Sequence, residues 1–143
     1  MPLVSVTRLR VRLWRYLPAF FLHTFRVARQ IRRQEGNLSF SLLNDARHTF
    51  WTLSVWRDEA AMRAFMNSDA HRQAMPHLLQ WCEEASLVHW TQESEEPPVW
   101  AEAHRRLLRQ GRLSKVNHAS VAHTRFEIPP PRPRARTITI SRV

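Results

Sequence analysis

The order of hydrophobic patterns along the chain is the feature that most restricts its fold. Over residues 3–14, Leu9, Val11 and Leu13 alternate with arginines, which predicts a strand with one aliphatic face. Residues 17–33 carry apolar side chains at spacings of three and four, which predicts an amphipathic helix. Residues 37–43 and 49–56 predict two strands joined by a short polar turn, and a hairpin follows from that spacing.

The pattern continues with a second helical region and a fourth strand. Helical spacing begins at Asp58, pauses at residues 67–69, and resumes from Ala70 to about Glu84, with Asp69 as the expected N-cap and Pro76 as an expected kink. Residues 86–91 predict the last strand. The order strand, helix, strand, strand, helix, strand predicts an α+β, ferredoxin-like domain: a four-stranded antiparallel sheet with helices on one face.

The second face of this sheet also needs a cover. Strand 49–56 is partly apolar on both faces, and a second copy of the sheet would bury the uncovered one. We therefore expect a symmetric homodimer.

Charge divides the chain into three parts. Residues 1–34 hold eight arginines and no acidic residue, residues 35–101 have a net charge of −6, and residues 102–143 have a net charge of +8. We expect a ferredoxin-like domain at 1–111, closing with a basic helix over 99–110, and a basic extension at 112–143. Within the extension, 120–128 is a candidate strand, 129–134 is polyproline-like, and 137–140 is either an edge strand or disordered.

Composition excludes several classes of protein. The single cysteine, Cys82, rules out an intrachain disulfide and a cysteine-rich zinc site, and its apolar neighbours indicate a buried thiol. Two glycines are too few for a glycine-rich phosphate loop or a serine nucleophile elbow. The sequence shows no membrane-spanning run and no secretory signal, so we expect a cytoplasmic protein.

The net charge of +10 allows an anionic partner but does not require one. Aromatic residues do not interleave with the basic residues of the C-terminal part, so a nucleic-acid partner is not expected. Peripheral contact with an anionic membrane surface stays open. The simpler alternative is an arginine-biased proteome, because 21 of the 22 basic residues are arginine.

One segment carries a family resemblance. Residues 50–65 read FWTLSVWRDEAAMRAF and residues 67–75 read NSDAHRQAM. A strand ending in Val55-Trp56, a short helix with an aromatic residue, and an Ala-His-Arg run together resemble the dimeric α/β-barrel superfamily of antibiotic-biosynthesis-type monooxygenases. Within it, the chain is most similar to spheroidene-monooxygenase-like proteins. The resemblance covers roughly Val6 to Trp90.

The resemblance implies a pocket between the sheet and the helices. Members use it for cofactor-free oxygenation of polycyclic substrates, for heme breakdown, or for heme-dependent hydroxylation. The heme-degrading branch has a tryptophan at the position of Phe65 and a histidine at that of Met75. This chain has neither, which counts against heme degradation and leaves another ligand or heme pose open.

His71 is the main candidate for catalysis. Its imidazole is a candidate heme ligand, or a general base near neutral pH. The alternative is a histidine bonded to a backbone carbonyl. Trp56, Phe65 and Met75 are candidate substrate-binding residues of the pocket wall, and ordinary core packing is their alternative. Arg10, in the ladder of arginines along the first strand, is a candidate for holding a carboxylate, against the alternative of a solvated face.

The sequence therefore predicts a monooxygenase-like oxidoreductase acting on a bulky apolar substrate, carotenoid-like or polycycle-like. The alternative is a non-catalytic protein that binds heme or another hydrophobic ligand. A third hypothesis is a structural protein that binds anionic surfaces.

Overall fold

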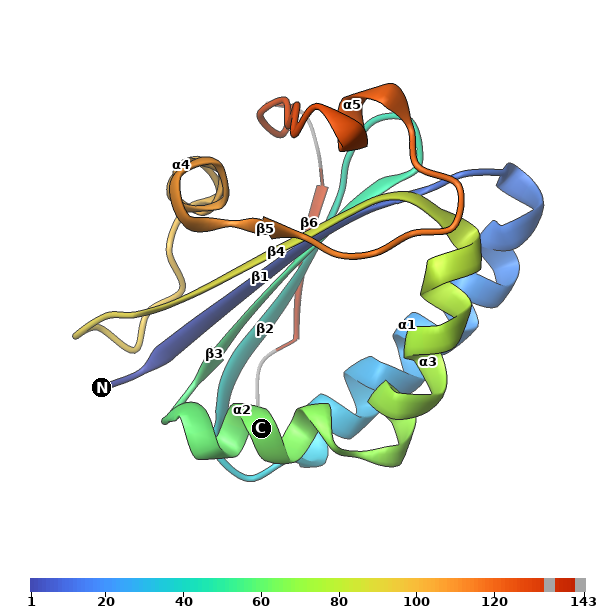
Figure 1. Ribbon diagram of the computed structural model, residues 1–143. Helices are drawn as coiled ribbons and strands as arrows, with labels where there is room; N and C mark the ends of the chain where they lie inside the picture. The colour runs from blue at the N-terminus through green and yellow to red at the C-terminus, as the bar shows by residue number, and fades with distance from the viewer. Residues whose placement is uncertain (133–135, 141–143) are drawn as a thin grey trace.

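A computed structural model describes residues 1–132 and 136–140 of the chain. A six-stranded antiparallel sheet in the order β5-β4-β1-β3-β2-β6 runs through it, with helices on both sides (Figure 1). The strands are β1 (Leu3–Val11), β2 (Asn37–Asn44), β3 (Thr49–Trp56), β4 (Cys82–Thr91), β5 (Arg112–Leu113) and β6 (Arg136–Ile140). The helices are η1 (Trp14–Tyr16), α1 (Leu17–Arg33), α2 (Glu59–Met66), α3 (Asp69–Trp81), α4 (Trp100–Gln110) and α5 (Val121–Thr124).

The central four strands and the first three α-helices have the predicted ferredoxin-like arrangement. The order β4-β1-β3-β2 places the first strand in the middle, paired antiparallel with β3 and β4. Two further edge strands make the sheet wider than the predicted four. β5 pairs with β4, and β6 pairs with β2, which confirms the edge-strand alternative for residues 137–140.

Helices α1, α2 and α3 lie together on one face of the sheet (Figure 1). The apolar stripe of α1 turns Phe20, Ala28 and Ile31 inward, where all three are buried. α2 adds Met62 and Phe65 to the same side. This face therefore holds the predicted helix–sheet core.

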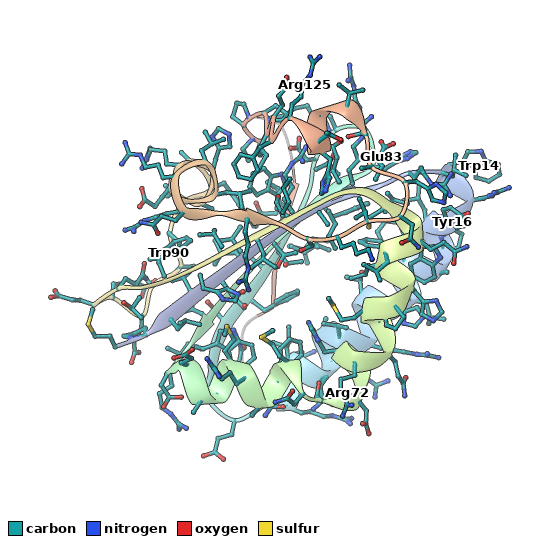
Figure 2. The ribbon with its side chains drawn as sticks, viewed as in Figure 1. Trp14, Tyr16, Arg72, Glu83, Trp90 and Arg125 are labelled. Atoms are coloured by element: carbon teal, nitrogen blue, oxygen red, sulfur yellow. The ribbon has the colours of Figure 1, made fainter. Side chains whose placement is uncertain are left out.

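The opposite face is covered by the chain's own C-terminal part, which corrects the expectation of helices on one face only. Ala103 and Leu107 of α4 are completely buried, and Ile128 packs in the same cluster as Trp51 and Val4 of the sheet. On the other side of β4 from the first three helices, the labelled Trp90 lies toward α4 (Figure 2), with the Arg106 guanidinium 5.2 Å from its ring.

This cover changes the basis of two predictions. A second sheet is no longer needed to bury the apolar face, so the homodimer stays a prediction without that support. The described residues of 112–140 share the sheet and the core with residues 1–111, and the boundary at 111 stays a prediction. Pro133 and Arg134 of the predicted polyproline-like stretch lie outside the described residues.

Helix α3 ends three residues earlier than predicted, because residues 82–84 belong to β4. In the strand register Glu84 stands opposite Arg10. Its carboxylate accepts from Arg8 Nη1 at 3.1 Å and from Arg10 Nη1 at 3.0 Å, while Arg10 Nε pairs with Glu83 at 3.0 Å. Residues 82–84 thus have a local sequence that favours a helix, but pairing with β1, including these ion pairs, stabilises them as part of a strand.

Two smaller predictions are corrected at helix starts. Ser68, not Asp69, occupies the N-cap position of α3. The candidate strand at 120–128 contains the short helix α5 instead, because Ser120 Oγ accepts from the His123 backbone N–H at 3.1 Å and starts a helical turn. Among the described residues, no helix is both long and apolar enough to cross a bilayer.

Candidate functional site

A cavity of about 210 Å³ lies between the sheet and helices α1, α2 and α3. Alternate residues of β1 and β3 form its floor, and the helices form its walls. The segment 112–116, which follows α4, closes one side. The lining is mostly apolar, as expected for a small-molecule site.

Four of the five predicted site residues line this cavity. They are Trp56, Phe65, His71 and Met75. Trp56 is completely buried, and its Nε1 donates to Ser54 Oγ at 2.9 Å. Phe65 stacks on Trp56 with ring centroids 5.3 Å apart, and the His71 ring stands edge-on to Phe65 at 5.2 Å. The three rings form a continuous aromatic wall that ends at an imidazole.

His71 is positioned by the first turn of α3 and is partly buried. Burial lowers the pKa of His71 below its usual value, and a hydrogen bond with the Met66 backbone opposes that shift. The imidazole is therefore neutral at pH 7 and able to accept a proton. A hydrogen bond with the backbone was the expected alternative to a functional role for His71. The structure contains that bond, and the imidazole nevertheless lines the cavity.

Methionine side chains give the cavity an adaptable side. Met75 lies one helical turn after His71 and is 42% exposed, and Met66 is 40% exposed. Both line the cavity together with Met62. Unbranched thioether chains fit irregular apolar shapes, so this side can adjust to the outline of a ligand.

Arg10 is not in the cavity, which corrects its predicted place in the pocket wall. It projects from the opposite face of β1, where it pairs with Glu83 and Glu84. Arg8 lies on the same face, is 4% exposed and shares Glu84. Arg8 therefore lies neither in the pocket nor on a solvated face, the two positions expected for these arginines. It is buried in the core, where Glu84 of β4 neutralises its charge.

Sequence reasoning missed the polar floor of the cavity. Ser5 and Thr7 of β1 face the cavity beside Ser54 and Thr52 of β3, which are their direct register partners. On its other side, Ser5 pairs with His89 of β4. A row of polar groups thus crosses an otherwise apolar floor. The sequence signal was present, since these small polar residues alternate with the buried core residues of β1 and β3.

Two further histidines of the cavity were also missed. Burial lowers the pKa of His23 on α1, and the nearby His77 and Arg26 side chains lower it further. Burial and the charge of Arg112 lower the pKa of His89, against the opposing effect of Glu59. The cavity therefore holds three imidazoles that stay neutral at pH 7.

Cationic groups lie at the side closed by the C-terminal part. Arg112 and Lys115 line the cavity and are exposed. Among the ion pairs formed by the described residues, none involves either of them. No acidic side chain belongs to the cavity lining described here. The cavity is thus apolar inside and positively charged at one rim.

The residues present do not fit heme well. The cavity volume of about 210 Å³ is below the roughly 300 Å³ at which pockets for drug-sized ligands begin. Arg10, the residue predicted to hold a carboxylate, points away from it.

Comparisons with known proteins agree with this geometry. Residues 18–77 match the family described as antibiotic biosynthesis monooxygenase. No curated protein gave a significant match.

Solved structures are similar in fold. A conserved protein from Methanosarcina mazei Go1 gives a TM-score of 0.59 at 14% identity, over 65% of this chain and 94% of that one. SnoaB, a cofactor-independent oxygenase from Streptomyces nogalater, gives 0.54 at 21% identity over 65% and 94%. A putative antibiotic biosynthesis monooxygenase from Nitrosomonas europaea gives 0.55 at 18% identity over 64% and 99%.

The predicted resemblance to the antibiotic-biosynthesis-monooxygenase superfamily is confirmed by the matched segment and the shared fold. Similarity to the spheroidene-monooxygenase-like proteins stays a prediction. The roles of the individual site residues are likewise proposals.

Proposed function

We propose that this chain, an antibiotic-biosynthesis-monooxygenase-like protein, oxygenates a compact polycyclic apolar substrate with His71 as general base and without heme. The main support for this proposal is the position of His71: its neutral, partly buried imidazole lies at the end of an aromatic wall inside a small apolar cavity. Between the predicted substrates, the cavity volume of about 210 Å³ favours a polycycle over a long carotenoid.

The chemistry needs a substrate with an acidic C–H next to aromatic rings or a carbonyl group. His71 removes that proton, and the electron-rich carbanion reduces O₂ directly. One oxygen atom becomes a carbonyl on the carbon, and the other leaves as water with the two hydrogens of the original CH₂. The CH₂ carbon is oxidised and O₂ is reduced, so no external reductant is required.

The cavity supports each part of this scheme. A lowered pKa keeps the His71 imidazole in its basic form at pH 7. The aromatic wall of Trp56 and Phe65 offers flat surfaces against which a ring system packs. Arg112 and Lys115, with no acidic residue in the described lining, favour the anionic form of the substrate.

Oxygen consumption with anthrone tests the proposal. Anthrone is a tricycle with an acidic CH₂ between two rings, and its oxidation to anthraquinone also changes its absorbance. We expect the purified chain to accelerate oxygen uptake above the buffer rate, and His71→Ala to lower the rate by about 10²-fold or more, as for loss of a general base. His118→Ala is the matched control, because His118 is exposed and outside the cavity lining.

Three outcomes separate the alternatives. Anthrone binding without oxygen uptake would favour the non-catalytic ligand-binding protein. A Soret band after hemin addition that disappears in His71→Ala would favour heme binding. Oxygen uptake that is equal in His71→Ala and His118→Ala would remove His71 from the mechanism.

A further inference from the structure

We propose that the outward face of η1 and α1 docks on an anionic membrane surface. This face exposes four large apolar side chains that a water-facing helix would not normally present. Their exposed fractions are 74% for Trp14, 44% for Phe21, 50% for Leu22 and 61% for Phe25. Exposed apolar residues scattered singly need no explanation, but these four are close together in one short segment.

Arginines share the same side of α1. Phe21, Phe25 and Arg29 follow one another at intervals of four residues, and Leu22 and Arg26 form the adjoining row. The Arg29 guanidinium lies 5.9 Å from the Phe25 ring centroid. The buried side chains of the helix, such as Phe20 and Ile31, face the sheet. The outward face is therefore both aromatic and cationic.

The positive charge of this face is not neutralised within the chain. Residues 1–34 contain no acidic residue, and of their eight arginines only Arg8 and Arg10 form ion pairs among the described residues. At the start of the face, the guanidiniums of Arg12 and Arg15 lie 5.6 and 5.3 Å from the Tyr16 ring. The remaining arginines are thus available to external anions.

This combination fits a lipid surface better than the other occupants. A helix with aromatic residues and arginines lies in the headgroup region, with its apolar groups in the acyl boundary and its cations on anionic lipids. A second copy would bring two faces of like charge together, which opposes association. A nucleic acid would leave the Leu22 side chain without a partner in the groove or on the phosphates.

Docking would also serve the cavity. The inner side of α1 contributes Phe20, His23 and Ile31 to the cavity lining, while its outer side carries the proposed docking face. One helix therefore joins the ligand site to the surface at which apolar molecules concentrate. The docking proposal does not depend on the proposed reaction, since it concerns the opposite side of the helix.

Vesicle co-sedimentation of the full chain tests the proposal. Binding to vesicles of 70% phosphatidylcholine and 30% phosphatidylglycerol is compared with binding to phosphatidylcholine alone, at low and high salt. We expect selective binding to the anionic vesicles that weakens with salt. Arg26→Gln/Arg29→Gln should reduce the partition coefficient about 30-fold, since each arginine near the surface contributes about fivefold.

Apolar contact is tested separately from charge. Trp14→Ser/Phe25→Ser should reduce the partition coefficient about tenfold or more. Phe21 is left intact because its ring packs against Phe20 and Phe50. Val99→Ser/Val121→Ser is the matched apolar control, since both side chains are exposed, at 70% and 67%, and lie outside η1 and α1. Arg72→Gln/Arg109→Gln, on α3 and α4, is the matched charge control, because both arginines are exposed and neither forms an ion pair among the described residues.

The outcomes decide the proposal. Loss of binding in both test variants, with both controls unchanged, supports it. It is overturned by absence of binding to anionic vesicles at low salt, or by equal losses in test and control variants. It is also overturned if the test variants abolish self-association or nucleic-acid binding while vesicle binding is unaffected.

Discussion

Replacing Leu107 by alanine tests whether α4 belongs to the folded core. The Leu107 side chain is completely buried in the cluster that covers the second face of the sheet. Leu108, the next residue of the same helix, is 44% exposed. Because Leu107→Ala and Leu108→Ala are chemically identical and adjacent, the difference between their effects isolates the burial of one side chain.

The magnitude follows from the atoms removed. Leucine to alanine deletes three carbon atoms, which at about 0.8 kcal/mol each gives a transfer loss of about 2.4 kcal/mol. The space left in a packed core adds to this, so we expect Leu107→Ala to lower the free energy of unfolding by about 3–4 kcal/mol. Leu108→Ala should cost less than about 1 kcal/mol, since its side chain is already hydrated.

Urea unfolding, followed by tryptophan fluorescence and by far-UV circular dichroism, measures both values. Equal effects of the two substitutions would refute the packing of α4 against the sheet. The wild-type midpoint is also recorded over a hundredfold range of protein concentration, where a midpoint that rises with concentration would support the predicted homodimer.

Three further predictions follow from the buried and titratable groups. Glu84→Gln should cost about 3–5 kcal/mol in urea unfolding, because it leaves the Arg8 guanidinium buried without its counter-charge, and Arg8→Met in the same chain should recover part of that loss. The low pKa of His71 means that protonation favours the unfolded chain, so its contribution to stability should be intact above pH 6.5 and lost as the pH falls through the folded-state pKa. His71→Gln should flatten the decline of thermal stability below pH 6.5, and an unchanged slope would contradict this. Burial raises the pKa of the Cys82 thiol to about 12, so a disulfide reagent at pH 8 should label the native chain at least about 10²-fold more slowly than the urea-unfolded chain.

Local sequence patterns correctly predicted the helices and strands that bury one face and expose the other, because that arrangement repeats in the sequence. The stripe through Phe20 and Ile31 predicted α1 with its observed bounds, because one face of that helix lies in the core. The alternation around Leu9 predicted β1, but the strand ends at Val11, three residues earlier than expected, and Trp14 begins η1. The pattern failed at residues 82–84. The glutamates after Trp81 are typical of a helical surface, but this segment pairs as a strand with β1, whose arginines lie about 75 residues earlier and contact Glu84.

The residues of the candidate site also fall into two groups: those that the sequence identified and those that only the structure places there. His71, Trp56 and Phe65 were identified because their segment resembles a known family, and they do line one cavity. His89 and Arg112 reach the same cavity through strand register, which no local pattern records. The sequence alone could not show whether the arginine-bearing face of β1 lies in the pocket, in solvent or in the core. That depends on which neighbouring strand carries the acidic residues, and this strand is β4.

Both edges of the sheet come from the last third of the chain, and this has a consequence for synthesis. While residues 1–91 emerge from the ribosome, the four central strands are available but β5 and β6 are not. During that interval the nascent chain would present two open strand edges and the uncovered apolar face around Trp51. The C-terminal segment therefore also protects the nascent chain from aggregation during translation. Variants that end after residue 91, which lack α4 and both edge strands, should accumulate in inclusion bodies.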